Sequence, residues 1–120
     1  MDRALESNRI FLDAWDVMNQ DAPGFASLRG GLFEASFCGV ASPFFNLVIA
    51  ARRPESLDEF AASFKQLQRW TAAQQVPWIL TLCHEIFGEL MPGAELIFER
   101  RRDWADDAAD RHGGYWTKAG

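Results

Sequence analysis

The sequence lacks a long hydrophobic run and has a deficit of positive charge. No stretch approaches the ~20 apolar residues that a membrane helix needs, so we expect neither a membrane span nor a membrane partner. Twelve Lys and Arg against seventeen Asp and Glu give a net charge of −5. Duplex-binding surfaces need clustered cations, and the cluster at 100–102 is followed at once by Asp103. We therefore expect no nucleic-acid partner.

Cysteine and histidine are scarce, with two of each. Cys38 and Cys83 lie in apolar, strand-like runs, where intracellular thiols are usually small buried hydrophobes, so we expect no disulfide. The segment that begins at His84 has Gly88 where a zinc-protease helix needs its second His. We therefore expect no metal site. The first residues include Asp2 and do not form a secretion signal, so we expect a cytoplasmic location.

The remaining composition is that of a soluble globular protein, with 48% hydrophobic and 24% charged residues. A chain of 120 residues buries roughly two-thirds of its unfolded surface, enough for one ordinary core. The chain becomes acidic and then glycine-containing beyond Trp104. We therefore predict a single domain over residues 1–103 and a C-terminal tail over residues 104–120.

Apolar spacing predicts two main helices. The first covers residues 4–19, and its expected core stripe consists of Phe11, Ala14, Trp15 and Met18. The second covers residues 57–75, and its apolar residues, including Phe64, keep a 3.6-residue period. Ser56 and Glu59 precede this period as a capping box, in which Glu59 is expected to bond back to the cap amide.

Alternating or continuous apolar residues predict strands, joined late in the chain by a short helix. The strands are residues 32–38, 46–51, 76–83 and 95–100, and the short helix is 86–91. We expect the first strand to be half-buried and Pro92-Gly93 to end the short helix. The helix 57–75 is long enough for a crossover, which predicts parallel flanking strands. The fold class is α+β, in the order α-β-β-α-β-α-β, with a mixed sheet of about four strands.

This order, together with the segment GVASPFFN from Gly39 to Asn46, resembles the N-terminal half of two-part proteins of the GNAT acetyltransferase superfamily. In such proteins a leading helix and strand are followed by a loop ending in Phe-Asn, a strand, a helix, and a strand containing Pro-Trp. Here the pairs are Phe45-Asn46 and Pro77-Trp78. The likeness covers about residues 8–103. It implies a curved mixed sheet and, in a complete enzyme, acyl transfer from coenzyme A to an amine.

The sequence departs from that family at the cofactor site. A complete GNAT domain has an Arg or Gln, two residues, a Gly, one residue, then a Gly or Ala, opening a helix whose amides bind the cofactor diphosphate. Arg29-Gly30-Gly31 precedes a strand, and Arg111 to Gly114 precedes no helix. We therefore expect no cofactor on this chain alone, with acetyl coenzyme A bound where a catalytic half is present.

Four residues are candidates for contact with a substrate: Glu34, Asn46, His84 and Glu85. Glu34 is expected on the polar face of its strand, either solvated or facing a cationic substrate. Asn46 suits a structural role, since Asn side chains satisfy loop amides at such junctions. Cys83, His84 and Glu85 cluster at a strand-to-helix junction, but adjacent strand residues point to opposite faces. We therefore assign no catalytic residue.

Three functions are compatible with these observations. The first is a GNAT-related half domain that is not an enzyme by itself and acts by association with a catalytic half or as a homodimer. The second is an autonomous N-acyltransferase whose degenerate site is built across a dimer. The third is a small α+β ligand-binding domain of the nuclear transport factor 2-like kind, against which the predicted parallel strand pair counts.

Overall fold

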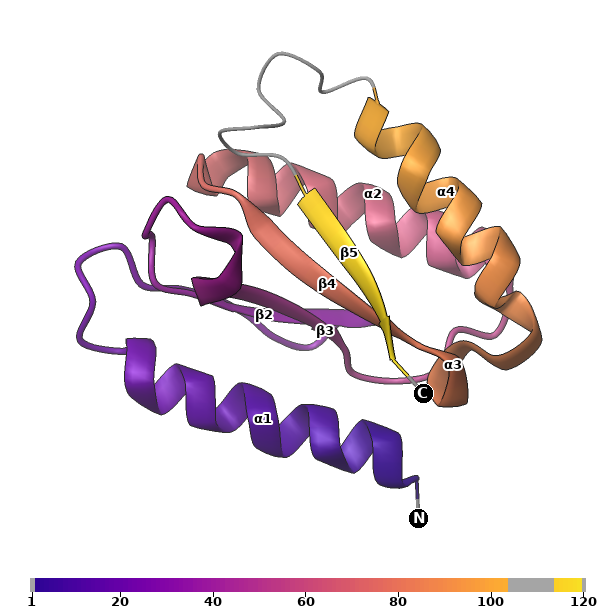
Figure 1. The fold of residues 1–120 in the computed structure, drawn as a ribbon, viewed down its shortest axis with the longest axis horizontal. Helices are drawn as coiled ribbons and strands as arrows, with labels where there is room; N and C mark the ends of the chain where they lie inside the picture. Colours follow the sequence, from indigo (N-terminus) through magenta and orange to yellow (C-terminus); the bar gives the residue numbers. More distant parts are fainter. Residues whose placement is uncertain (1, 104–113, 120) are drawn as a thin grey trace.

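The computed structural model describes residues 2–103 and 114–119, with side chains described for residues 2–100 (Figure 1). The helices are α1 (Arg3–Asn19), α2 (Leu57–Gln74), α3 (His84–Phe87) and α4 (Met91–Asp103), with the 3₁₀ turns η1 (Pro43–Phe45) and η2 (Gly88–Leu90). The strands are β1 (Ala26–Leu28), β2 (Phe33–Phe37), β3 (Asn46–Ala50), β4 (Trp78–Cys83) and β5 (Gly114–Ala119).

The strands form one mixed, curved sheet in the order β1-β2-β3-β4-β5. β1 pairs with β2, and β2 with β3, in the antiparallel sense, whereas β3 pairs with β4, and β4 with β5, in parallel. The predicted α+β class and the parallel pair flanking the crossover helix are therefore confirmed. Among the residues that the structure describes, the sheet has five strands, where about four were expected. In the described residues, no helix combines the length and apolar character needed to cross a membrane.

Helices cover both faces of the sheet, with α2 and α4 on one side and α1 on the other (Figure 1). Phe33, Ala35 and Phe37 of β2 belong to the larger core cluster under α2 and α4. The intervening Glu34 and Ser36 are also buried, because α1 lies over their face. The prediction of a half-buried first strand is therefore wrong. Alternation shows which residues share a face, but not whether a helix covers the polar one.

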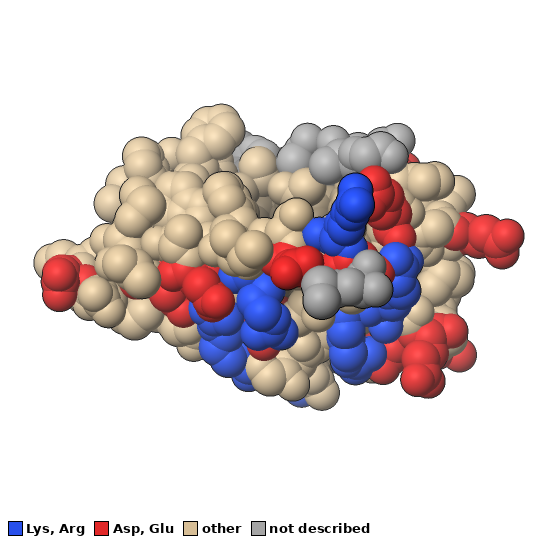
Figure 2. Space-filling model, turned by 90° about the horizontal axis from the view of Figure 1, so that it is seen from below, with Lys and Arg blue, Asp and Glu red and all other residues tan. Residues whose placement is uncertain are grey.

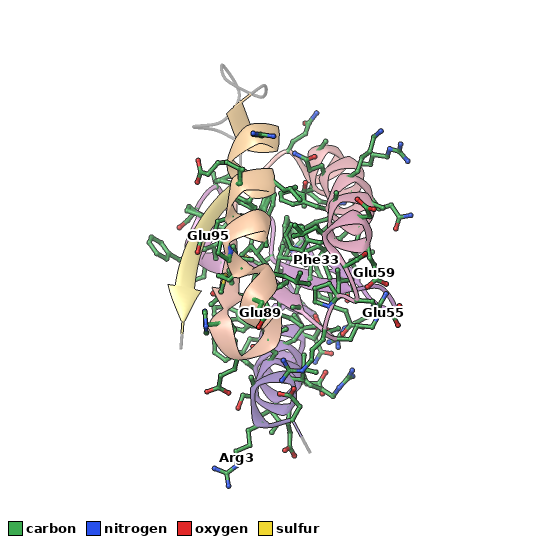
Figure 3. All side chains as sticks on the ribbon, turned by 90° about the vertical axis from the view of Figure 1, so that its right-hand side faces the viewer. Arg3, Phe33, Glu55, Glu59, Glu89 and Glu95 are labelled. Carbon is green, nitrogen blue, oxygen red and sulfur yellow. The ribbon has the colours of Figure 1, made fainter. Side chains whose placement is uncertain are left out.

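α2 forms as its sequence signals predict. The Ser56 hydroxyl accepts from the backbone N–H of Glu59 at 3.1 Å, and the buried residues of the helix are Phe60, Phe64, Leu67 and Thr71. One detail differs. The Glu59 carboxylate accepts from the amide of Glu55, at 2.7 Å, and not from the Ser56 amide. Figure 3 shows Glu55 and Glu59 together at this end of the helix.

The predicted strand 95–100 and the predicted stop at Pro92-Gly93 are both wrong, because residues 91–103 form α4. Pro92 occupies the first turn, where the missing N–H costs no hydrogen bond. The core contacts of α4 come from Met91, Ala94 and Phe98, which follow helical spacing. A Cβ at Gly93 would lie 2.5 Å from Cδ1 of Leu57. This glycine therefore permits α4 to approach α2 closely.

α1 forms as predicted, but it is rotated about its axis, so that of the expected stripe Trp15 packs against the core while other members face outward. Its buried residues are Leu12 and Asn19, whereas Phe11 and Met18 of the expected core stripe are 53% and 69% exposed. The inward face is partly polar because its amides have partners on the sheet. Asn8 donates to the carbonyl of Ala50, at 3.0 Å, and Asn19 donates to the Ser36 hydroxyl, at 3.2 Å.

The prediction for the C-terminal segment is also wrong in part. Residues 114–119, which we expected to lie in a tail, form β5 alongside β4. Residues 104–113 and 120 of the predicted tail lie outside the described residues. The boundary at residue 103 follows the change in composition, but the sheet includes residues beyond it.

Candidate functional site

A group of four charged side chains lies between α1 and the start of β2, around Arg29. The Nη2 atom of Arg29 is 2.5 Å from Oδ2 of Asp16 and 3.1 Å from Oδ1 of Asp13. Its Nη1 atom is 3.5 Å from Oε1 of Glu34. The amide of Gly30 donates to the second Glu34 oxygen, at 2.8 Å. One guanidinium therefore joins three carboxylates from two elements, and we call these four residues the Arg29 cluster.

The electrostatics of the Arg29 cluster are unbalanced. Partial burial acts to lower the pKa of Arg29, but the hydrogen bonds that Arg29 donates to Asp16 and Asp13, together with the charges of Asp16 and Glu34, raise it above the ordinary value. Glu34 is 6% exposed, so its expected solvation is wrong. Within the described residues, Glu34 Oε1 and Asp16 Oδ1 are buried without a hydrogen-bond partner. One Arg and three carboxylates give the cluster a formal charge of −2.

Asn46 is completely buried and acts as a connector between loop and sheet. Its Oδ1 accepts from the amides of Cys38 and Gly39, at 3.1 and 3.2 Å. Its Nδ2 donates to the carbonyls of Val40, Ser42 and Pro77, at 2.8, 3.1 and 2.8 Å. Both acceptor lone pairs and both amide protons are thus engaged by the backbone. The structural role expected for Asn46 is present, and no hydrogen-bonding capacity remains for a substrate.

The loop that Asn46 holds also makes a close backbone contact. Gly39 has φ of +86°, and a Cβ there would lie 2.7 Å from the Cα of Gly24. A side chain at Gly39 would therefore meet both backbone strain and a steric clash. The turn after α1 and the loop after β2 are pressed together at this point.

His84 and Glu85 are exposed on α3, directly after β4. Cys83 is partly buried, and both cysteines are free. The neighbouring interactions involve the backbone. Arg53 donates to the carbonyls of Glu85 and Ile86 and pairs with the Asp2 carboxylate. Arg53 therefore connects the start of α1 to α3, while the side chains of His84 and Glu85 remain at the surface.

The structure does not bring the four candidate residues together. Asn46 contacts Pro77 before β4 begins, whereas His84 and Glu85 follow the other end of that strand. Glu34 faces α1 within the Arg29 cluster. Among the described residues, no hydrogen bond or ion pair between side chains connects Glu34 or Asn46 to His84 or Glu85, and no group of three His, Cys, Asp or Glu is placed to hold a metal ion.

A small apolar depression lies elsewhere, between the β1–β2 turn and α2. Its volume is about 90 Å³, and it is lined by Leu28, Gly31, Leu32, Phe33, Ser63, Gln66 and Leu67. Phe33, labelled in Figure 3, lies at the core side of this region. The depression contains none of the four candidate residues, and its polar lining is limited to Ser63 and Gln66.

Sequence reasoning missed Arg29 as the partner of Glu34, and Asp13 and Asp16 as the two other carboxylates that Arg29 contacts. The spacing of Asp13 and Asp16 places both on one side of a helix, which was an available signal. The sequence does not predict the contact with Arg29, because that contact depends on how the β1–β2 turn packs beside α1.

Comparison of the chain with protein-family models, with curated proteins and with solved structures found no match.

Proposed function

We propose that this chain is a GNAT-related half domain that has no diphosphate site of its own and acts by association, either with a catalytic half or with a second copy. Two features support this proposal. One is the mixed sheet with a crossover helix between parallel strands, and the other is the set of side chains at the N-terminus of that helix. In open α/β arrangements, a helix N-terminus after a parallel strand is the usual place for a phosphate group.

The observation that carries the proposal is that acidic side chains of the chain itself occupy this N-terminus. The first turn of α2 contains Asp58 and Glu59. The Ser56 hydroxyl accepts a hydrogen bond from the amide of Glu59. The Glu59 carboxylate accepts one from the amide of Glu55. These carboxylates repel an anion, and they already benefit from the positive end of the helix dipole. Residues 51–56 also contain no glycine that would allow close approach of a diphosphate.

The two arginines in the loop before α2 are likewise committed to groups of the protein. Arg52 pairs with Glu59, with Nη2 2.9 Å from Oε2. This contact holds the pKa of Glu59 below its ordinary value, with help from the Glu55 amide and against partial desolvation. Arg53 is bound to Asp2 and to two α3 carbonyls. A diphosphate at this helix would therefore have to displace existing partners.

Calorimetric titration of the chain with acetyl coenzyme A tests the proposal. We expect no saturable heat up to millimolar ligand, and amide chemical shifts at residues 55–60 that do not change. Saturable binding by the chain would overturn the proposal and favour the autonomous N-acyltransferase. The nuclear transport factor 2-like alternative fits less well, because β3 and β4 run parallel. The expected cytoplasmic location stays a prediction.

A further inference from the structure

The strongest unassigned feature is an apolar surface on the outer side of α1. Four large α1 side chains, together with three from the loop and 3₁₀ turn before β3, are each between 47% and 72% exposed: Ile10, Phe11, Val17, Met18, Val40, Phe44 and Phe45. We call these seven residues the α1 patch. Its two parts are joined by rings, because Trp15 makes edge contacts with Phe11 and Phe45, with centroids 6.1 and 6.4 Å apart.

The α1 patch is large for a surface that remains in water. Counting about 150–250 Å² for a large side chain, its exposed fractions correspond to roughly 800 Å². The largest apolar patch on a typical monomer is about 300–600 Å², and a standard interface takes about 800 Å² from each partner. Figure 2, which views the α1 side, shows a broad area with few charged side chains beside a border where they gather. One protein partner would therefore cover the patch.

The inward face of α1 supports the same interpretation. The helix buries Asn19 and bonds the Asn8 amide to the sheet, whereas Ile10, Phe11, Val17 and Met18 point outward. A helix that only needed to cover the sheet would gain more by turning its apolar side inward. The observed orientation leaves that side available for a partner.

We propose that the α1 patch binds a second copy of this chain, with the two α1 helices packed antiparallel about a two-fold axis near Ala14. This inference specifies the homodimer branch of the proposed function. Helical spacing puts exposed Ala14 in the middle of the apolar stripe, where its small side chain allows close approach. The twofold operation then places Ile10 against Met18 of the second copy and Phe11 against its Val17, so the stripe is complementary to itself.

The charges at the ends of α1 favour the antiparallel arrangement. Arg3 is exposed at the N-terminal end and points away from the body in Figure 3, and Asp21 is exposed just beyond the C-terminal end. In the described residues, neither has an ion-pair partner within the chain. They are separated by about 27 Å at the helical rise of 1.5 Å per residue. About an axis near Ala14, antiparallel packing places Asp21 of each copy about 6 Å along the helix from Arg3 of the other, within reach of the long Arg side chain, whereas parallel packing brings like charges together.

Sedimentation equilibrium of the full chain, with Ile10→Glu and Leu96→Glu as a matched pair, tests this inference. Both residues are exposed on helices, at 63% and 51%, but Leu96 lies on α4, outside the α1 patch. We expect the native chain and Leu96→Glu to have about twice the 13.6 kDa mass of one chain. Ile10→Glu should raise the dissociation constant by at least about 30-fold, as expected for a central interface residue.

A charge exchange tests the orientation of the two helices. Arg3→Asp should weaken the dimer by placing two carboxylates together, and Arg3→Asp combined with Asp21→Arg should restore it. Circular dichroism checks that each variant is folded. If Ile10→Glu does not fold, Met18→Glu takes its place.

Two outcomes would overturn the inference. One is a native chain that remains monomeric at concentrations up to the order of 0.1 mM. The other is a dimer that Ile10→Glu or Met18→Glu leaves intact, which would point to pairing through a sheet edge. Failure of the charge exchange to restore the dimer would overturn the antiparallel geometry. Sedimentation does not depend on cofactor binding, so this inference and the proposed function fail through different measurements.

Discussion

Replacement of Asn46 by Ala should be among the most destabilising single changes in the fold. The substitution removes five hydrogen bonds from a side chain that is completely buried. Two of these bonds, to the Cys38 amide and the Pro77 carbonyl, are buried away from solvent. Each orphaned buried group costs about 1–3 kcal/mol, whereas the other three partners are only partly buried. We therefore expect a loss of roughly 3–5 kcal/mol in the free energy of unfolding.

Urea unfolding followed by circular dichroism measures this loss, with Asn8→Ala as the matched control. Asn8 makes one side-chain bond to the sheet, to the Ala50 carbonyl, so its loss should be about 1 kcal/mol. The m-value should be similar for both variants, so that the midpoint reports stability. Equal midpoints for Asn46→Ala and Asn8→Ala would refute the reasoning. A substrate-binding role for Asn46 would instead predict lost binding with stability retained.

Three further perturbations test the packing and the charges. Ser56→Ala should cost about 1 kcal/mol through the lost cap, and Phe64→Ala, which is 1% exposed, about 3–5 kcal/mol; near-equal losses in urea would contradict the assigned core. Gly93→Ala should cost about 1–3 kcal/mol by pushing Leu57 aside, offset by about 1 kcal/mol of helix propensity, and a raised thermal midpoint would show that α2 and α4 adjust freely. A hydrogen bond from the Leu5 amide, opposed by desolvation and aided by Arg53, lowers the pKa of Asp2 below 3.8. Because the folded-state pKa is the lower one, this contribution is complete above 3.8 and is lost as the pH falls through the lowered value. Urea midpoints of the native chain and Asp2→Asn should therefore differ near neutral pH and converge in acid, and a constant difference would contradict the assignment.

Local signals in the sequence were sufficient for α2 and for the parallel pair that it connects. The cap, the period and the length of the segment all agree there, and the fold class follows from them. Local signals were not sufficient to predict α4. Residues 95–100 alternate polar and apolar side chains well enough to predict a strand, but the helical set Met91, Ala94 and Phe98 forms the buried face. Where the apolar residues of a short segment fit both the strand period and the helix period, tertiary packing decides which structure forms.

The candidate site was less predictable than the fold, because its contacts join distant segments. Glu34 was recognised as a candidate, but its burial depends on α1, and its charged neighbour Arg29 lies in a turn. The prediction of which side of α1 faces the core failed for a related reason. Apolar spacing predicts an apolar side of a helix, but it does not say whether that side faces the core or a partner.

The position of β5 has a practical consequence for any shortened version of this protein. A piece ending at residue 103, where the composition changes, would lose the strand that pairs with β4 over residues 78–83. The edge of the sheet, which β5 forms in the intact chain, would then be formed by the mostly apolar β4, whose exposed amides and carbonyls favour pairing between molecules. Insolubility of such a piece would reflect the missing strand and would carry no information about the activity of the intact chain.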